Sequence, residues 1–425
     1  MKIAIIGAGF TGLSAAYELS KKGHKVTVFE KDKNPGGLAV GFKQKGWKWS
    51  LEKHYHHWFT NDKEIISLAK EIKFPVVTRR PKTSIYVNQN TYKLDSPLNV
   101  IFFPLLPIID RFRLGFSIAV FRFNPFWKPL EKYNAVKILP KLMGKKAYEM
   151  IWEPLFINKF GRFSQNVSLA WFWARIIKRT PSLCYPKGGF LEFANSLTKK
   201  IEEKEGVFYF STEVKKLESD NLPLITYQKE NAVIETEEFD KVIVTTPIFI
   251  FFSFTPQLPE KYKNNILNLK SLGAINLVLR LKKPFFKDNT YWLSVCDKNA
   301  PVMAIVEHTN FIDKKNYNNE HLLYLGNYKE RENSLFSMDA NQILSLFDPY
   351  LKKINPKYSK FIIGYDLFKD PFAQPVIPVN YSKIIPKMIT PLKNVYLANI
   401  EQVYPWDRGT NYAVELGKRV ADKVI

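Results

Sequence analysis

The hydrophobic and polar positions of the first thirty residues predict a strand, a helix and a second strand. Lys2 to Ile6 is a short apolar run that is typical of a buried parallel strand. A helix is predicted over Leu13 to Lys22, and Gly23 ends it. Lys25 to Phe29 then forms the second strand. This order is that of a β-α-β unit, so it predicts an open α/β sheet.

The patterns further along the chain predict a second region of mixed secondary structure. Alternating residues predict a strand pair at 85–87 and 91–94, with a turn between them, so the part from about 81 to 184 is expected to be largely helical after this pair. Strand-like runs follow at 274–281 and 321–324, with a helix near 341–352.

Three glycines in the segment 7–12, Gly-Ala-Gly-Phe-Thr-Gly, join the first strand to the first helix. Gly7 lets the chain turn tightly, Gly9 leaves the backbone open to a pyrophosphate, and Gly12 lets the helix pack closely on the sheet. The helix start stabilises such an anion through its unpaired N–H groups and positive dipole. Glu30, about twenty residues further on, is placed to accept the ribose hydroxyls of an adenosine. Chance could produce the glycines alone, but strand, helix, second strand and acid in register predict a dinucleotide site.

The residues after Glu30 favour FAD over NAD as the dinucleotide. The segment Asn34-Pro35-Gly36-Gly37-Leu38 places a second pair of glycines soon after the acid. Backbone without side chains at these positions could lie against the rest of an extended cofactor.

These motifs resemble the flavin-containing amine oxidase superfamily, which includes monoamine oxidases, protoporphyrinogen oxidase, phytoene desaturases and, more distantly, UDP-galactopyranose mutase. Later segments are similar in the same order: 187–190, 213–214, 242–247, 395–399 and 409–421. The resemblance implies FAD bound without a covalent link, because the closing segment has no cysteine. It implies these cofactor-binding residues: Gly7, Gly9, Phe10, Thr11, Gly12, Glu30, Lys31, Gly36, Gly37, Leu38, Val214, Thr246, Asn399, Gly409, Thr410, Tyr412 and Ala413.

The chain departs from that family pattern where the chemistry is expected. Ala398-Asn399 replaces the usual Gly-Asp or Gly-Glu, although an asparagine can still hydrogen-bond the flavin ribityl chain. Asn276 stands where amine oxidases tend to carry a lysine near flavin N5, and Gly409 replaces one wall of their aromatic cage. We therefore do not expect oxidation of a simple amine, whereas flavin binding remains expected.

Three of the six histidines lie in the segment 54–62, soon after the second glycine pair. Imidazoles move protons or polarise a substrate near neutral pH. The segment resembles a histidine-containing stretch of UDP-galactopyranose mutases that lies close to the flavin, and His54 and His57 are the matching positions. The alternative is a structural turn with buried imidazoles. No acid or cysteine at a recognisable spacing accompanies them, so no metal site is predicted.

The segment 404–412 precedes the last helix, whose N-terminus should point at the flavin and stabilise negative charge on it. Arg408 could add to this stabilisation or hold a substrate carboxylate or phosphate, and Tyr404 or Trp406 could form a wall of the flavin site. An Asp-Arg pair at a helix start is also typical of a local salt bridge. The candidate catalytic residues are therefore His54, His57, Tyr404 and Arg408.

The composition indicates a folded protein of 425 residues with a large core, since 46% of them are hydrophobic and 15% aromatic. The formal charge of +23 is consistent with an anionic membrane surface or substrate, or with a compositional bias of the genome, which we favour for most of it. No basic run belongs to a nucleic-acid-binding fold, so no nucleic-acid partner is expected. Two isolated cysteines, Cys184 and Cys296, and no export signal indicate a cytoplasmic protein.

Residues 92–128 have the most unusual composition, with bulky apolar groups among arginines at 111, 113 and 122. One interpretation is a patch that contacts a membrane or opens a tunnel for a lipid-like substrate, with Trp127 at the interface. The other, which we favour, is the helical core of a substrate domain. The longest apolar run, 100–109, is too short to cross a bilayer, which takes ~18 residues.

The order of motifs predicts an α/β protein with two interleaved domains. Segments 1–80, 185–250 and 385–425 should form a Rossmann-like FAD-binding domain of three layers around a mostly parallel sheet, while 81–184 and 251–384 form an inserted α+β substrate domain. The expected function is an FAD-dependent oxidoreductase that passes hydride from an organic small molecule, large and apolar, to flavin N5. The alternative is a non-redox flavoenzyme of the UDP-sugar mutase type. A peripheral membrane contact stays open, as does the oligomeric state.

Overall fold

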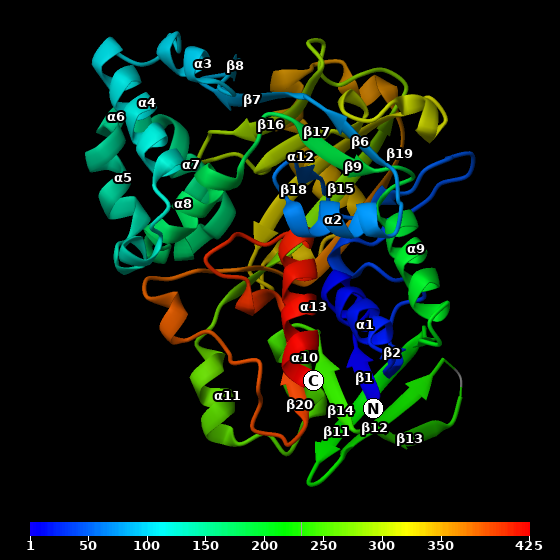
Figure 1. Cartoon of the computed structure of the whole chain (residues 1–425). Helices are drawn as coiled ribbons and strands as arrows, with labels where there is room; N and C mark the ends of the chain where they lie inside the picture. The colour runs from blue at the N-terminus through cyan, green and yellow to red at the C-terminus, as the bar shows by residue number, and fades with distance from the viewer. Residues whose placement is uncertain (231) are drawn as a thin grey trace.

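Five parallel strands form the sheet that the first β-α-β unit begins. In the computed structural model, which describes residues 1–230 and 232–425, their order is β10-β2-β1-β14-β20. Their bounds are β1 Lys2–Ile6, β2 Lys25–Phe29, β10 Val207–Tyr209, β14 Lys241–Val244 and β20 Val395–Leu397. The register places Ile5 between Val28 and Ile243. Segments far apart in the sequence are thus neighbours in one sheet (Figure 1).

Alternating side chains bury both faces of this sheet, as is usual for parallel strands. Ile3 and Ile5 share a core with the helices on one face, α1 (Phe10–Lys21), α9 (Phe190–Glu202) and α13 (Thr410–Val424). Ala4, Ile6 and Phe29 face an antiparallel sheet made of β11 (Thr212–Ser219), β12 (Pro223–Lys229) and β13 (Ile234–Glu238). Helices, parallel sheet and antiparallel sheet are the three layers that the sequence predicted.

A larger mixed sheet lies beyond this unit, with strand order β19-β15-β18-β17-β16-β7-β8. Its only parallel pair is β16 with β7. The bounds are β7 Lys82–Val87, β8 Asn90–Lys93, β15 Ser271–Leu281, β16 Thr290–Val295, β17 Ala304–Glu307, β18 His321–Lys329 and β19 Ile362–Pro375. Leu277 on β15 shares a core with Phe347 on α12 (Ala340–Ile354), so this face is covered. Side chains at 276, 278 and 280 alternate to the opposite face.

Short elements connect the two sheets. Two small sheets pair β3 with β4, and β9 with β5 and β6. The remaining bounds are β3 Gly41–Phe42, β4 Leu51–Glu52, β5 Trp58–Phe59, β6 Val76–Arg79, β9 Leu183–Pro186, α2 Lys63–Glu71, α10 Ile248–Phe254 and α11 Glu260–Leu267.

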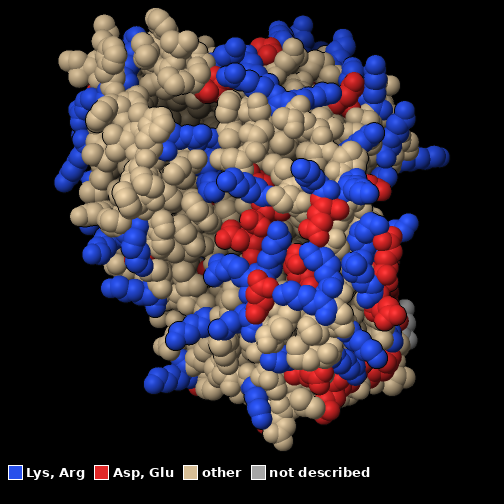
Figure 2. Space-filling model, viewed as in Figure 1, with Lys and Arg blue, Asp and Glu red and all other residues tan. Residues whose placement is uncertain are grey.

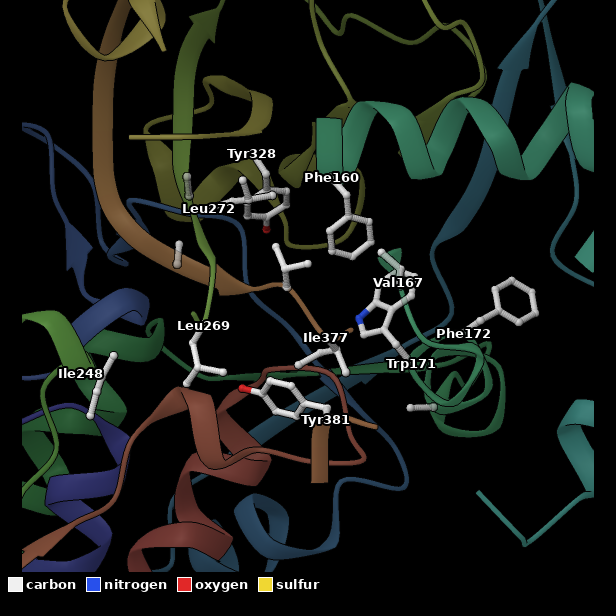
Figure 3. Packing of buried hydrophobic residues seen from close by; sticks show 14 of the residues in the cluster. Phe160, Val167, Trp171, Phe172, Ile248, Leu269, Leu272, Tyr328, Ile377 and Tyr381 are labelled. Carbon is white, nitrogen blue, oxygen red and sulfur yellow. The ribbon is translucent and has the colours of Figure 1, made fainter. Parts of the chain in front are cut away.

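Six short helices follow β8 and form a helical subdomain at the upper left of Figure 1. They are α3 Pro97–Ile101, α4 Ile108–Phe123, α5 Ala135–Met143, α6 Lys145–Ala147, α7 Glu153–Phe160 and α8 Leu169–Lys178. Phe160 and Trp171 pack edge to face at 4.8 Å. Figure 3 shows these rings near Tyr328 of β18 and Ile377, so the core of the subdomain continues into the large sheet.

The structure agrees with the elements predicted from the sequence and shifts some of their ends. The first helix begins at Phe10 rather than Leu13, because the glycine turn closes at Gly9 and the next three residues already form the first helical turn. The predicted strand pair, the strands in 271–281 and 321–329 and the helix at 340–354 are all present. The predicted domain boundaries remain a prediction. Among the described residues, no helix is long and apolar enough to cross a membrane.

Candidate active site

The first glycine turn connects β1 to α1 and leaves the helix start uncapped. Gly7 has a φ of +106°, which favours glycine, and a Cβ at Gly12 would overlap the Gly7 carbonyl oxygen. Gly9 caps the helix without any side-chain hydrogen bond to the first turn. The N–H groups of Phe10 and Thr11 therefore remain available to an anion such as a pyrophosphate.

The second glycine pair lies directly against the first turn. The N–H of Gly36 donates to the Ala8 carbonyl at 2.9 Å, and Gly36 forms a parallel bridge with Gly9. A Cβ at Gly37 would lie 3.1 Å from the Gly9 Cα, and both glycines of the pair have positive φ. Leu38 follows, half-buried against the core. Two backbone turns without side chains thus form one cradle, which we call the glycine cradle (Gly7–Gly12 with Gly36–Gly37).

Glu30 lies at the end of β2 and its carboxylate is beside the glycine cradle. Oε2 accepts a hydrogen bond from the Ala8 N–H at 2.7 Å, and Oε1 accepts one from the Asp32 N–H at 2.9 Å. Loss of hydration raises the pKa of this carboxyl, although the two hydrogen bonds act in the opposite direction. The acid is therefore fixed beside the first glycine turn, and its contact with a ribose stays a prediction.

Val214 and Lys31, two further predicted cofactor-binding residues near Glu30, lie in different surroundings. The Thr212 N–H donates to the Glu30 carbonyl at 2.8 Å, which brings β11 and the half-buried Val214 next to the acid. Lys31 points outwards, and its ammonium lies 3.5 Å from a carboxylate oxygen of Glu213. Val214 thus lies beside Glu30, whereas the Lys31 ammonium is directed toward Glu213.

The carboxyl ends of β14 and β20 bring Thr246 and Asn399 together. Asn399 Nδ2 donates to the Thr246 carbonyl at 3.2 Å. Thr246 Oγ1 is buried and has no hydrogen-bond partner among the described residues. Since buried hydroxyls usually find a partner, this one marks a place for a polar ligand atom. Glu401, which sequence reasoning missed, is buried two residues beyond Asn399, and burial raises its pKa to about 7.

The last helix begins at the same site. Gly409 caps α13 with no side-chain hydrogen bond to the first turn. A Cβ at Gly417 would overlap the Thr11 carbonyl oxygen, so α13 crosses the start of α1 in close contact. The predicted cofactor residues of the first turn follow Gly409 in order: Thr410, Tyr412 and Ala413. The glycine cradle, Glu30, the unpartnered Thr246 hydroxyl and two uncapped helix starts fit a dinucleotide that extends toward a flavin.

The three histidines of the 54–57 segment are held in defined orientations. Asn276 Nδ2 donates to His54 Nδ1 at 2.6 Å, and the Tyr291 hydroxyl lies 3.1 Å from His57 Nδ1. His56 Nδ1–H donates to the His54 carbonyl at 2.6 Å. Burial lowers the pKa of the imidazoles to about 3 for His54, about 4 for His56 and about 3 for His57. All three are therefore neutral at pH 7 and act through hydrogen bonds rather than charge.

Asn276 occupies the position where the family resemblance expects a lysine. It lies on β15 opposite Gly326 of β18, whose missing Cβ leaves room for the Asn276 amide and the Tyr55 ring. Its Oδ1 is buried without a partner among the described residues. The site thus presents a neutral amide and the His54 imidazole instead of an ammonium.

The 404–412 segment binds the helical subdomain through Asp407. Its carboxylate accepts from Arg175 Nη1 at 2.6 Å and from Trp171 Nε1 at 3.2 Å, and Lys159 Nζ lies 3.6 Å away. Gln374 Nε2 also approaches it at 3.4 Å. Although burial opposes ionisation, Lys159 and Arg175 hold the pKa of Asp407 well below its usual range. The sequence also allowed a local salt bridge between Asp407 and Arg408. The structure instead pairs Asp407 with Arg175.

Two arginines near this carboxylate have no acidic partner among the described residues. Arg408 Nε donates to Gln374 Oε1 at 2.8 Å, and its guanidinium stacks over the Tyr328 ring at 4.8 Å. Arg179 lies close enough that its charge lowers the pKa of His57, after the larger effect of burial. Loss of hydration lowers the pKa of the half-buried Arg408 to about 10. The surroundings of the histidines therefore carry more positive than negative charge.

Tyr404 and Trp406, the predicted flavin walls, both contact the helical subdomain. The Tyr404 hydroxyl donates to Glu131 Oε2 at 3.0 Å, and its ring packs edge to face on Trp127. Trp406 stacks between Trp173 at 5.4 Å and Tyr412 at 5.8 Å. Tyr412 is thus the member of this stack that lies on the predicted flavin helix.

Comparison with known proteins identifies the class. The family model for flavin-containing amine oxidoreductases matches residues 10–425, so the chain belongs to that family, as its motifs indicated. The class is thus that of the flavin-containing amine oxidoreductases. An L-amino-acid oxidase of Crotalus adamanteus is 23% identical over 308 residues, which are 68% of this chain and 59% of that protein. The chain therefore spans less than two thirds of the curated relative it matches.

Solved structures show the same fold at low sequence identity. An oxidoreductase from Methanosarcina mazei superposes with a TM-score of 0.77 at 20% identity, over 99% of this chain and all of the other. A reduced UDP-galactopyranose mutase superposes with a TM-score of 0.76 at 16% identity, over 100% of this chain and 95% of the other. Both likenesses concern the fold alone.

Proposed function

We propose that this protein binds FAD without a covalent link and oxidises an organic small molecule. A bound flavin would supply a hydride acceptor at N5 and a route for the electrons to oxygen, a quinone or another acceptor. The observation that carries this proposal is the glycine cradle. Its two turns have no side chains at the glycines, so a pyrophosphate can approach the backbone closely, with Glu30 beside it. The chain's own residues bind and orient the substrate and exclude water from it.

The substrate we propose combines a large apolar body with an anionic group. Tyr55 packs edge to face against Trp292 and Tyr324, so aromatic faces surround the histidine segment. The half-buried Arg408 and the exposed Arg179 form no salt bridge with an acid among the described residues, so both can pair with an anion. A carboxylate or phosphate on the substrate would pair with these guanidinium groups, which bind both in a bidentate manner.

The neutral amide and imidazole of Asn276 and His54 argue against a simple amine. The His54 imidazole, with Nδ1 already accepting from Asn276, presents Nε2–H as a donor. Such a donor can orient a substrate oxygen and stabilise charge that develops on it. It does not supply the ammonium that the family resemblance associates with amine oxidation.

A second candidate is a non-redox flavoenzyme of the UDP-sugar mutase type. The arginines without acidic partners favour it, because a nucleoside diphosphate carries the negative charge that they lack. The histidine segment and the shared fold are consistent with this candidate. Such an enzyme needs a reduced flavin but consumes no reductant.

We also propose a reducing, cytoplasmic setting. Cys184 and Cys296 are buried and form no disulfide in the described part of the chain, and burial raises the pKa of the Cys296 thiol to about 12. Both thiols behave as small apolar groups rather than as reactive ones.

An anaerobic screen tests the proposed function and separates the two candidates. The purified protein should be yellow, and an anionic apolar substrate should bleach the flavin absorbance without oxygen. Amines, polyenes and porphyrinogens are compared with and without a carboxylate or phosphate, and UDP-sugars are tested beside them. Isomerisation of a UDP-sugar by dithionite-reduced protein, without net electron transfer, would overturn the oxidoreductase proposal in favour of the mutase.

Replacing Glu30 tests the cofactor site directly. Glu30→Ala removes the acceptor for Ala8 N–H and for the predicted ribose, so flavin affinity should fall about tenfold or more, since a hydrogen bond to a charged group is worth about 1.5–3 kcal/mol. Flavin fluorescence during dialysis measures the retained fraction. Glu332→Ala, at an exposed position, is the control. Equal retention in both variants would show that the ribose contact is misplaced.

A further inference from the structure

The longest helix of the helical subdomain exposes a continuous apolar stripe. The side chains at 109, 112, 116, 120 and 123 recur every three or four residues, so they share one face of α4. Phe112 is 61% exposed, Phe116 73% and Phe123 82%. Neighbouring apolar side chains of α3 and of the turn after α4 are exposed as well. We call the whole set the α4 ridge: Leu98, Phe102, Ile108, Ile109, Phe112, Phe116, Val120, Phe123 and Phe126.

The opposite face of α4 already forms the core of the subdomain. Leu114 and Phe121 are buried, and Phe121 packs against Phe172 of α8 at 5.2 Å. The helix therefore needs no further burial on the ridge side for folding. Exposed apolar patches of this extent are rare on proteins without an interaction site, so the ridge indicates a surface that binds a partner.

The charges around the ridge favour an anionic surface as that occupant. Residues 97–178 contain 13 Lys and Arg but four Asp and Glu. Three of these acids are already paired: Glu131 with Lys128 at 2.8 Å, Glu149 with Lys145 and Glu153 with Lys298. Exposed lysines follow on the adjacent α5 and α6: Lys137, Lys141, Lys145 and Lys146. Figure 2 shows a broad uncharged area over the helical subdomain, with Lys and Arg along its edge.

The arginines within the ridge segment have internal roles instead. Arg122 Nη1 donates to the carbonyls of Ile176, Ile177 and Arg179 at 2.7–3.0 Å, which caps the end of α8. Arg111 donates to the Leu106 and Ile101 carbonyls. The lysines beside the ridge, rather than these two arginines, are therefore the groups available to bind headgroups.

We propose that the α4 ridge docks this protein on an anionic lipid bilayer. The apolar side chains enter the boundary between headgroups and acyl chains, and the surrounding lysines contact phosphate groups. A second copy of the chain fits less well, because a symmetric contact would bring the two lysine clusters together without facing acids. The proposal stands independently of the substrate, although docking would place a lipid-like substrate beside the helical subdomain.

Co-sedimentation of the flavin-loaded protein with vesicles tests this proposal. Phosphatidylcholine vesicles containing phosphatidylglycerol should bind the protein, and vesicles of phosphatidylcholine alone should bind less. The triple variant Phe112→Ser, Phe116→Ser, Phe123→Ser should lower the partition coefficient at least tenfold, because it removes three phenyl rings from the apolar contact. Raising the salt should weaken binding by screening the lysines.

Matched controls make each outcome decisive. Val233→Ser removes an equally exposed apolar side chain, 83% exposed, near β13, outside the helical subdomain, and should bind as the unchanged protein does. All variants should retain flavin and melt at the same temperature, because the ridge is not part of the core. Failure of the unchanged protein to bind anionic vesicles at low salt would overturn the proposal. So would a dimer in sedimentation equilibrium that the triple variant dissociates, because the ridge would then bind a second copy.

Discussion

At the scale of single residues, Gly12 is the position where one methyl group should have the largest effect. A Cβ there would overlap the Gly7 carbonyl oxygen, which belongs to the backbone and cannot rotate away. Gly12→Ala should destabilise the protein by about 1–3 kcal/mol and lower flavin retention, as thermal melting and flavin fluorescence would measure. Gly115→Ala in α4, where a Cβ meets only Val100 at 3.8 Å, is the control and should be neutral or stabilising. A stable, yellow Gly12→Ala variant would contradict this prediction.

Glu401 makes a prediction about pH. Burial raises its pKa to about 7 in the folded protein, above the usual value of about 4.3 for an unfolded chain. A carboxyl of this kind stabilises the fold fully only below its unfolded pKa, and this stability is lost as the pH rises through about 7. Glu401→Gln should therefore gain about 1–3 kcal/mol relative to the unchanged protein between about pH 5 and pH 8.

Thermal melting of both proteins across this pH range measures the gain at position 401. Glu260→Gln replaces a side chain that is 77% exposed on α11, and its melting temperature should follow that of the unchanged protein. A constant difference between Glu401→Gln and the unchanged protein at every pH would show that Glu401 ionises normally.

At the scale of elements, Arg122 fixes the end of α8 against α4. Its guanidinium Nη1 donates to the carbonyls of Ile176 and Ile177 in α8 and of Arg179 directly after it, so Arg122→Ala removes this donor. We expect a loss of about 1.5–3 kcal/mol and faster amide exchange in α8, measured by melting and by hydrogen exchange. Arg113→Ala, which removes one bond to the Lys141 carbonyl, should cost less. Equal effects would show that the cap has no special role.

At the scale of the whole molecule, Asp407 joins the closing segment to the helical subdomain. Asp407→Asn leaves Lys159 and Arg175 without a carboxylate, which should cost about 3–5 kcal/mol. Because the folded pKa of Asp407 is depressed, its stabilisation is present above its unfolded pKa and is lost as the pH falls toward the folded one. The cost should therefore be the same at neutral and mildly acidic pH in melting experiments.

The matched control for Asp407 is a surface ion pair. Asp422 lies 2.8 Å from Lys22 at a position where its side chain is 72% exposed. Asp422→Asn should cost less than about 1 kcal/mol. A similarly small cost for Asp407→Asn would mean that the helical subdomain is held by its aromatic contacts alone.

The residues of the site are of two kinds, those that the sequence predicted and those that it missed. Gly7, Gly9, Gly12 and Glu30 could be identified because they lie within one β-α-β unit, where short-range sterics determine the turn and the spacing to the acid. Lys159, Arg175 and Arg179 were missed, because isolated basic residues on or beside helices carry no local pattern. The sequence favoured a core for the apolar residues of 92–128 and did not predict the exposure of the α4 ridge, since an apolar helix face has the same pattern whether a core or solvent lies beside it.

The sequence by itself determined the class of cofactor, the α/β architecture and the absence of the amine-oxidase lysine, because each of these depends on residues that are close together in the chain. Only the tertiary structure decided that Asn276 meets His54, that Asp407 turns toward Arg175 rather than Arg408, and that α4 leaves its phenyl rings uncovered. The first two contacts join segments more than two hundred residues apart. The third feature depends on the lack of any element packed against the exposed face of α4 among the described residues. Long-range packing, unlike a local turn, has no signature in any single stretch of sequence.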